Sequence, residues 1–294
     1  MMVSVCMITY NHEKYIAQAI EGVVMQNTNF DFELVIGEDC SLDATRKICL
    51  DFKEKYPEKI RLLLNEKNLG MMPNFIQTLN VCNGKYIALC EGDDYWTDPK
   101  KLQKQVDLLE NNSDFVMSFH NTKVEYDNGQ KTELSNNYKK DTILTIVDLI
   151  KEWNIMTASL VFKNVLPKKY PDWFYQLKNG DYGLELLLGD KGQIYYHNIV
   201  MAAYRKHVGG ISNLYWGINL RLELIKLLNN FNQYSKFKYK SQIKETVKHN
   251  LMKIKEFYTS ENCGIVNKIK NYLIICFLTI PLYKYYIRYY EKKK

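Results

Sequence analysis

The sequence predicts an α/β fold with a mainly parallel central sheet flanked by helices, followed by a C-terminal helical extension. Two observations lead to this class. Short apolar, β-branched runs alternate with segments whose apolar residues recur at helical spacing, and such alternation requires crossovers between parallel strands. The chain of 294 residues also exceeds what most single cores reach, so we expect one large domain with an appended element.

The first two strand–helix units are expected before residue 56. Residues 3–9 (VSVCMIT) are apolar and β-branched, which is typical of a buried parallel strand. Residues 15–25 carry apolar residues at helical spacing and predict a helix. Residues 32–37 (FELVIG) predict the second strand, and residues 43–55 the second helix.

Two more units follow, with strands and helices predicted at residues 60–64, 74–81, 86–90 and 100–110. The fourth strand ends abruptly in acidic residues. Asp98 followed by Pro99 is typical of an N-cap and the first position of a helix, which supports the helix at 100–110.

The regular alternation breaks after residue 110. We expect strands at 115–119, 123–126, 157–162 and 193–204, a helix at 182–188 and a polar surface loop at 127–141. From residue 215 onward the pattern is helical. The predicted organisation is therefore a catalytic domain in residues 1–212 and a helical extension in residues 213–294.

The net charge of +7 is concentrated near the C-terminal end. Residues 251–294 contain nine Lys/Arg and three Asp/Glu, so they carry +6, and the first 250 residues are close to neutral. A body that binds nucleic acid would need a basic face, so we expect no nucleic-acid partner. Seven scattered cysteines without a CxxC pair suit a reducing cytosol. No signal peptide is recognised, which favours a cytoplasmic location.

Polar and acidic residues follow three of the predicted strands. The first strand ends in Thr9-Tyr10-Asn11, the second in Glu38-Asp39 and the fourth in Glu91-Gly92-Asp93-Asp94. Ligands bind at the carboxyl ends of the strands in open parallel sheets, so a ligand is expected at this edge.

The acidic run after the fourth strand predicts a metal site. Glu91, Asp93 and Asp94 repel one another unless a positive group lies between them, and Mg²⁺ and Mn²⁺ prefer oxygen ligands and often bridge to phosphates. The alternative is an acidic cap for the helix at 100–110, a position that Asp98 already fills. GxGxxG and GxxxxGK[ST] loops are absent, which disfavours a dinucleotide dehydrogenase and a P-loop NTPase.

Four motifs in order resemble family 2 glycosyltransferases of the GT-A fold. These are TYNHEKYIAQAIEGVVMQ, LVIGEDCSLDAT, NLGMMPNF and GKYIALCEGDDYWTDPKKLQKQV, which lie within residues 3–106. Weaker similarity continues through NGDYGLELLLGDKG and YRKHVGGIS to residue 212. The resemblance does not extend over the helical extension.

The resemblance implies a nucleotide-binding set. The first-strand motif would wrap the base and ribose, and Asp39 would accept a hydrogen bond from a pyrimidine N–H. Glu91 stands where the family usually has the first Asp of its DxD motif, and Glu38 also replaces a usual Asp. The implied nucleotide-binding residues are Thr9, Tyr10, Asn11, Asp39, Asn68, Glu91, Gly92 and Asp93.

The resemblance also implies a metal site and a base. Asp93, Asp94 and His207 would hold Mn²⁺ or Mg²⁺, and Asp181 would be the general base. The alternatives are that Asp181 only caps a helix and that His207 is structural. The remaining histidines receive no role: His12, His120, His197 and His249.

These observations predict an inverting, metal-dependent glycosyltransferase. It would move a hexosyl or N-acetylhexosaminyl group from a nucleotide-diphosphate sugar, most simply a UDP-sugar, to a saccharide or lipid-linked acceptor in bacterial-type surface-glycan synthesis. One alternative is a sugar-nucleotide nucleotidyltransferase, although residues 10–15 lack the glycine-rich basic loop of that class. Another is a non-catalytic carbohydrate-binding protein on a transferase fold.

The C-terminal segment 272–294 has features of a membrane-binding segment. Residues 272–283 (YLIICFLTIPLY) are mostly apolar but shorter than the about 20 residues that a spanning helix needs. Aromatic and basic residues follow, a pattern that favours an interfacial anchor on the anionic inner face of the plasma membrane. The alternative is a terminal helix docked on the body.

Overall fold

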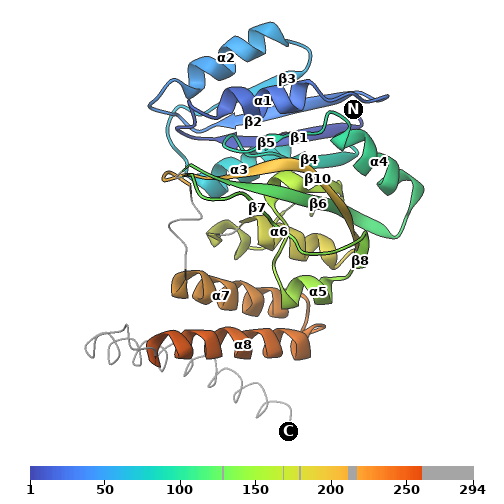
Figure 1. Ribbon diagram of the computed structural model, residues 1–294, viewed down its shortest axis with the longest axis vertical. Coiled ribbons are helices and arrows are strands. Elements are labelled where there is room, and N and C mark those ends of the chain that lie inside the picture. The colour runs from blue at the N-terminus through green and yellow to red at the C-terminus, as the bar shows by residue number, and fades with distance from the viewer. Residues whose placement is uncertain (128, 168, 179, 211–216, 260–294) are drawn as a thin grey trace.

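The computed structural model describes residues 1–127, 129–167, 169–178, 180–210 and 217–259. A ten-stranded sheet runs through the molecule with helices on both faces, and two further helices lie below one helical layer (Figure 1). The architecture confirms the predicted α/β class.

The parallel part of the sheet comes from the first 89 residues. Its strands are β1 (Val3–Thr9), β2 (Phe32–Glu38), β3 (Ile60–Leu64) and β4 (Tyr86–Leu89), in the spatial order β3-β2-β1-β4. All three pairings are parallel. Because the strands run in one direction, the loops that follow them leave the sheet at the same edge.

The rest of the sheet is mixed. β9 (Val161–Lys163) lies antiparallel between β4 and β6 (Phe115–Tyr126), and β10 (Gln193–Lys206) runs parallel to β6. β5 (Tyr95–Trp96) pairs antiparallel with the end of β10. Two short strands, β7 (Glu133–Leu134) and β8 (Thr142–Leu144), pair with β6 and β10. β5 thereby brings the chain just after β4 against the end of β10.

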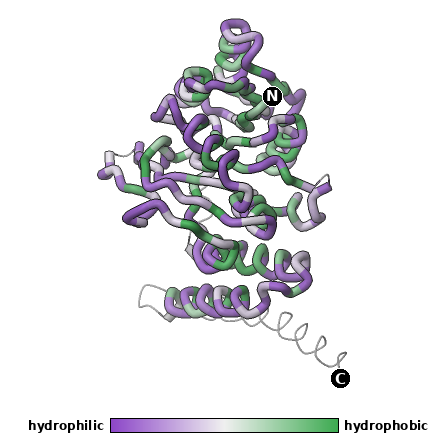
Figure 2. Tube along the Cα trace, turned by 90° about the vertical axis from the view of Figure 1, so that its right-hand side faces the viewer, coloured by the Kyte–Doolittle hydropathy of each residue, from purple (hydrophilic) through white to green (hydrophobic). Residues whose placement is uncertain are grey.

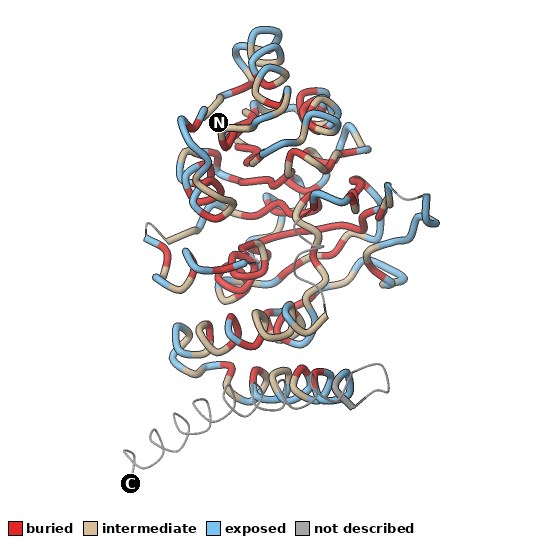
Figure 3. The backbone as a smooth tube through the Cα atoms, turned by 90° about the vertical axis from the view of Figure 1, so that its left-hand side faces the viewer, coloured by how far each residue is buried: buried red, intermediate tan, exposed pale blue. Residues whose placement is uncertain are grey.

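Helices cover the two faces of the sheet and give two apolar cores. α1 (Ile16–Val24), α2 (Thr45–Lys55) and α4 (Lys101–Asn111) pack with Val5 and Met7 of β1 in one cluster. α3 (Met71–Val81), α5 (Ile146–Lys151) and α6 (Gly180–Gly189) pack with Cys6 in the other. Successive side chains of a strand point to opposite faces, so β1 contributes to both cores. The sheet strands are largely buried (Figure 3).

Two helices extend the second core. α7 (Ile218–Tyr234) contacts α6, and α8 (Lys240–Thr259) contacts both α5 and α7. Leu228, Phe231 and Ile243 belong to the same apolar cluster as α5 and α6. The described part of the predicted extension is therefore packed on the body, and most of α8 is hydrophilic on its outer side (Figure 2). The predicted boundary at residue 212 stays a prediction, and residues 272–294 lie outside the described residues.

Several predicted elements differ from the structure. The strands predicted at 115–119 and 123–126 are one strand, β6, because the polar residues between them are buried in the sheet; the Asn121 side chain bonds with Asn136 and Ser135. The strand predicted at 157–162 begins with a 3₁₀ turn (Thr157–Ser159), and only Val161–Lys163 pairs in the sheet.

Two helices also begin differently from the prediction. α3 begins at Met71, three residues earlier than predicted, because Pro73 is tolerated in a first turn. The N-cap of α4 is Lys100 rather than Asp98, whose carboxylate accepts the Lys100 N–H at 2.8 Å. The short elements β5, β8 and α5 were not predicted, since their few residues carry too little periodicity.

Among the residues that the structure describes, no helix combines the length and apolar character needed to cross a membrane.

Candidate active site

The loops after β1, β2 and β4 meet at the carboxyl edge of the sheet. The Asp39 N–H donates to the Thr9 carbonyl at 3.1 Å, and the Gly92 N–H donates to the Ile8 carbonyl at 3.0 Å. Gly92 lies so close to β1 that a Cβ there would be 2.6 Å from the Thr9 hydroxyl oxygen, so only glycine fits. The three polar strand ends predicted to form a ligand site are therefore brought together.

Asp39 organises the loop between β3 and α3. Its carboxylate accepts hydrogen bonds from the Asn65 amide (2.9 Å), the Leu69 N–H (2.8 Å) and the Gly70 N–H (2.9 Å), and the residue is 2% exposed. Asn68 donates to the Asp39 carbonyl at 3.2 Å. Most of the accepting capacity of the carboxylate is used by this loop. A contact between Asp39 and a nucleobase stays a prediction.

The residues after β1 connect the first two loops. Asn11 has a positive φ of 55°, its N–H donates to the Ser41 hydroxyl at 3.0 Å, and its side-chain oxygen accepts the Leu42 N–H at 2.8 Å. Tyr10 is 38% exposed beside them. The chain thus holds Asn11 rigidly and leaves the Tyr10 ring open to a ligand.

Three carboxylates crowd the end of β4. One oxygen from each of Glu91, Asp93 and Asp94 lies within 4.8 Å of the other two. Asp94 is fully buried; its Oδ1 accepts the Arg205 N–H at 2.9 Å, and its Oδ2 has no hydrogen-bond partner among the described residues. Burial, together with the charges of Asp93 and Glu91, raises the pKa of Asp94 well above its ordinary value. Burial and the charge of Asp93 likewise raise the pKa of Glu91.

Asp93 is the member of this cluster that faces two imidazoles. Its Oδ2 lies 3.0 Å from Nε2 of His207 and 3.7 Å from Nε2 of His12. Burial works against ionisation of Asp93, but the hydrogen bond from His207 and the nearby charge of His12 outweigh it and lower the pKa. Asp93 is therefore the carboxylate most stable in its charged form.

Arg205 joins β10 to the acidic loop. Its guanidinium donates to the Asp93 carbonyl at 2.7 Å and to the Gln18 side chain, and it packs over the Tyr15 ring (5.3 Å) and the Tyr95 ring (4.3 Å). Sequence reasoning missed Arg205, although it precedes His207 by only two residues. The guanidinium bonds backbone and amide oxygens and so holds the acidic loop in place, and its charge acts to lower the pKa of Asp94, although burial outweighs it.

Asp181 lies in the first turn of α6, inside the helix rather than at its N-cap. Its oxygens accept the Tyr182 N–H (2.9 Å) and the Thr157 hydroxyl (3.2 Å). Burial raises its pKa despite these hydrogen bonds. The charge of Asp181 contributes to the raised pKa of Glu91, which places the start of α6 within electrostatic reach of the acidic cluster.

Glu185, one helical turn after Asp181, is a second residue that sequence reasoning missed. It is fully buried, and burial followed by the charge of Asp181 raises its pKa well above the ordinary value. Its signal in the sequence is an acid within the apolar run LELLLG. Glu185 is therefore a buried acid without access to solvent that lies within electrostatic reach of Asp181.

The chain belongs to glycosyl transferase family 2, whose sequence profile matches residues 4–166. This match contains the acidic loop after β4, whereas Asp181, Arg205 and His207 lie beyond it. An uncharacterised protein of Mycobacterium tuberculosis is 35% identical over 222 residues, which cover 71% of this chain and 60% of that protein. The alignment thus spans about 60% of the length of the mycobacterial relative.

A second relative has a named activity. WfgD of Escherichia coli, a UDP-Glc:alpha-D-GlcNAc-diphosphoundecaprenol beta-1,3-glucosyltransferase, is 34% identical over 116 residues, which cover 39% of this chain and 44% of WfgD.

Solved structures share the fold. Residues 1–349 of Staphylococcus aureus TarS, in complex with UDP-GlcNAc, align with a TM-score of 0.57 and 22% identity over 78% of this chain and 67% of theirs. The mannosyltransferase PcManGT of Pyrobaculum calidifontis, in complex with GDP-Man and Mn²⁺, aligns with a TM-score of 0.58 and 13% identity over 98% of this chain and 82% of that one. At these identities the likeness shows the GT-A fold alone.

The role of Asp39 in holding the loop between β3 and α3 can be tested by substitution. Asp39→Asn keeps the size of the side chain but leaves one of three N–H donors facing an amide NH₂, so we expect the free energy of unfolding to fall by about 1–3 kcal/mol. Urea unfolding measures this loss, and limited proteolysis should show new cleavage within residues 65–70. Asp31→Asn, at an exposed position, is the control. Wild-type stability with lost nucleotide affinity would contradict the loop role.

Proposed function

We propose that the protein is an inverting, metal-dependent glycosyltransferase. It would transfer a hexosyl or N-acetylhexosaminyl group from a UDP-sugar to a hydroxyl of a saccharide or lipid-linked acceptor in surface-glycan synthesis. The observation that carries the proposal is the arrangement of Asp93, whose pKa is lowered by His207 and His12, in the same acidic loop as Glu91, which lies within electrostatic reach of Asp181 at the start of α6. Family membership supports transfer of sugars over the nucleotidyltransferase alternative.

The donor nucleotide is proposed to lie along the loops after β1 and β2. Tyr10 offers an exposed ring for the base, and the loop held by Asp39 borders the same edge. UDP is the first choice because WfgD is named for UDP-Glc and TarS was solved with UDP-GlcNAc. A lipid-linked acceptor is supported by the diphosphoundecaprenol in the name of WfgD.

The residues at the end of β4 fit a divalent cation. The buried Asp94 Oδ2 has no partner among the described residues, and burial together with the neighbouring carboxylates raises the pKa of both Glu91 and Asp94. Asp93, Asp94 and His207 would hold the ion. A bound Mg²⁺ or Mn²⁺ supplies Lewis-acid stabilisation of a leaving diphosphate.

Asp181 is proposed to accept the proton of the acceptor hydroxyl. An attacking hydroxyl must lose its proton as the bond forms, and a carboxylate within hydrogen-bond reach serves this purpose. Thr157 and the Tyr182 N–H fix the Asp181 carboxylate, and burial raises its pKa above the ordinary value, which strengthens it as a base. Attack from the side opposite the leaving group inverts the anomeric carbon.

The proposed activity is tested by incubating the purified protein with a panel of sugar nucleotides and Mn²⁺ and measuring slow hydrolysis. We expect hydrolysis of UDP-sugars, loss of activity in EDTA and recovery with added Mn²⁺. Asp93→Asn should abolish turnover with the fold intact, because the charge that balances the cation is gone. Asp107→Asn, exposed on α4, is the control. Undiminished activity in EDTA would exclude the metal requirement.

The base is tested by Asp181→Asn. We expect kcat to fall on the order of 10²–10⁴, the usual share of general base catalysis, while donor affinity measured by calorimetry stays unchanged. In the wild type, the raised pKa of Asp181 should move the acidic limb of the kcat profile above the ordinary range for an aspartate. Donor affinity that falls in step with kcat would instead make Asp181 a donor ligand or a structural residue.

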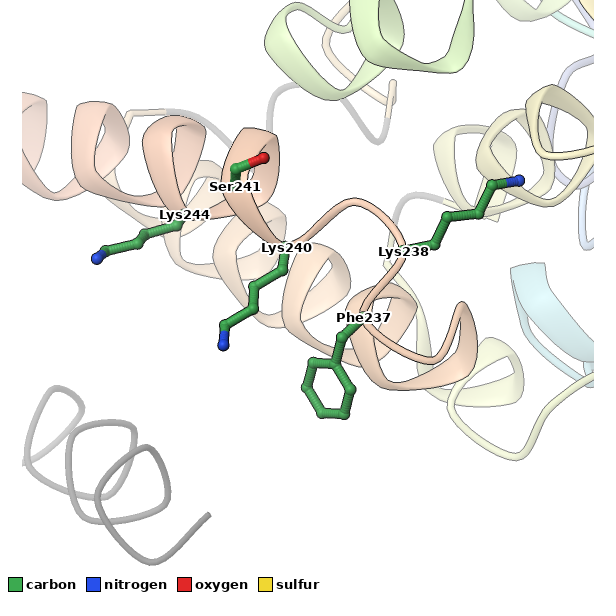
Figure 4. A pocket seen from close by; sticks show the side chains of 5 residues that line it. All are labelled: Phe237, Lys238, Lys240, Ser241 and Lys244. Atoms are coloured by element: carbon green, nitrogen blue, oxygen red, sulfur yellow. The ribbon is translucent and has the colours of Figure 1, made fainter. Parts of the chain in front are cut away.

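We also propose peripheral attachment to an anionic membrane surface. The apolar segment 272–283 lies outside the described residues, but the turn between α7 and α8 carries a basic pocket lined by Phe237, Lys238, Lys240, Ser241 and Lys244. Lys240 and Lys244 point to the same side of α8 (Figure 4). Lys238, which lines the same pocket, pairs with Asp190 at 2.8 Å.

Vesicle binding tests the attachment. Each basic residue near a charged leaflet contributes about 1 kcal/mol, screened by salt. Ending the chain at residue 270, or introducing Lys240→Glu with Lys244→Glu, should weaken binding to vesicles that contain anionic lipid, and added salt should weaken wild-type binding. Lys47→Glu with Lys55→Glu, exposed on α2, is the control. Equal binding by all variants would contradict the proposal.

A further inference from the structure

Three side chains from distant parts of the sequence converge beside the acidic loop. His12 follows β1, Asp93 follows β4 and His207 follows β10. One potential ligand atom from each, two imidazole nitrogens and a carboxylate oxygen, lies within 4.8 Å of the other two. Both histidines direct Nε2 toward the same Asp93 oxygen, at 3.7 and 3.0 Å.

The His12 ring is held in this orientation by its other nitrogen. Its Nδ1 lies 3.3 Å from the Thr9 hydroxyl oxygen, and its backbone N–H donates to the Thr45 hydroxyl at 2.8 Å. A histidine that binds a metal through one nitrogen commonly has the other nitrogen fixed by a hydrogen bond. The two rings are 6.0 Å apart and nearly perpendicular (89°), so they converge on Asp93 without stacking.

The His207 ring is fixed by packing. It lies against the Tyr15 ring at 4.6 Å, and the Tyr15 hydroxyl donates to Asp127 at 2.6 Å. The three side chains also reach solvent in part, with exposed fractions of 16% for His12, 18% for Asp93 and 6% for His207, whereas Asp94 has none. A ligand phosphate can therefore approach the histidine side of Asp93 but not the Asp94 side.

We propose that His12 is a protein ligand of the divalent cation, which is then held by two imidazole nitrogens and the Asp93 carboxylate. This inference rests on the proposed metal-dependent function. It replaces Asp94, which has no exposed surface, with His12 in the set of protein ligands, and it names the ion that this set selects. Mg²⁺ prefers an all-oxygen shell, while imidazole suits transition ions. The site therefore selects Mn²⁺ or a similar transition ion over Mg²⁺.

Metal binding without donor tests the inference. Free Mn²⁺ is measured by electron paramagnetic resonance during titration of the full chain, with Mg²⁺ as competitor. We expect the wild type to bind Mn²⁺ at least about tenfold more tightly than Mg²⁺, and His12→Leu to lose at least about tenfold in Mn²⁺ affinity with little change for Mg²⁺. His249→Leu, exposed on α8, should bind like the wild type.

Pulsed paramagnetic resonance of bound Mn²⁺ gives a readout that does not depend on the variant folding. The wild type should show hyperfine coupling to two imidazole nitrogens. Wild-type Mn²⁺ affinity in folded His12→Leu, or coupling to one nitrogen or none in the wild type, overturns the ligand role of His12. Donor hydrolysis that survives this outcome leaves the proposed function standing. Two-nitrogen coupling in a protein that hydrolyses no sugar nucleotide would support the cation site and reject the function.

Discussion

Carboxylate crowding at the end of β4 is the constraint on which the site depends. Glu91, Asp93 and Asp94 lie within 4.8 Å of one another in a largely buried loop, where burial and mutual repulsion raise the pKa of Glu91 and Asp94. The three carboxylates have different neighbours that stabilise their negative charge. The Arg205 N–H binds Asp94, while two imidazoles face Asp93 and keep it charged. β10 supplies both Arg205 and, just beyond its end, His207, so the pairing of β10 with β5 and β6 sets the electrostatics of the loop.

Local patterns predicted the parallel half of the fold well, because each element there carries its own signal. β1 and β3 have the predicted bounds, and the apolar, β-branched residues of β1 are buried by the helices on each face. The later half was harder. His120, Asn121 and Thr122 look like a break in the sequence, yet they continue β6, where Ser135 and Asn136 bond the Asn121 side chain and the Thr122 N–H from outside the strand. No local pattern contains that information.

In the site, too, features with a local sequence signal were predictable and features that depend on distant residues were not. The acids at the ends of β2 and β4 were predictable, since carboxyl ends of parallel strands meet at one edge. His12 was not, although it lies only three residues beyond Thr9, because its closeness to Asp93 depends on a partner 81 positions away in the chain. The surroundings of the aspartates also differ, and the sequence does not show these differences. Asp39 is occupied by three N–H donors, Asp94 is buried with one oxygen unpartnered, and Asp181 is held at the start of α6.

The central claim is that Asp93 and its two histidines place a cation against the diphosphate of a sugar-nucleotide donor. Electron–nuclear double resonance on the protein with Mn²⁺ and UDP measures this arrangement directly, because it detects nuclei bound to or near the ion. We expect simultaneous coupling of Mn²⁺ to imidazole nitrogen and to the phosphorus of UDP. Coupling to phosphorus without nitrogen, as for Mn²⁺–UDP free in solution, would contradict it.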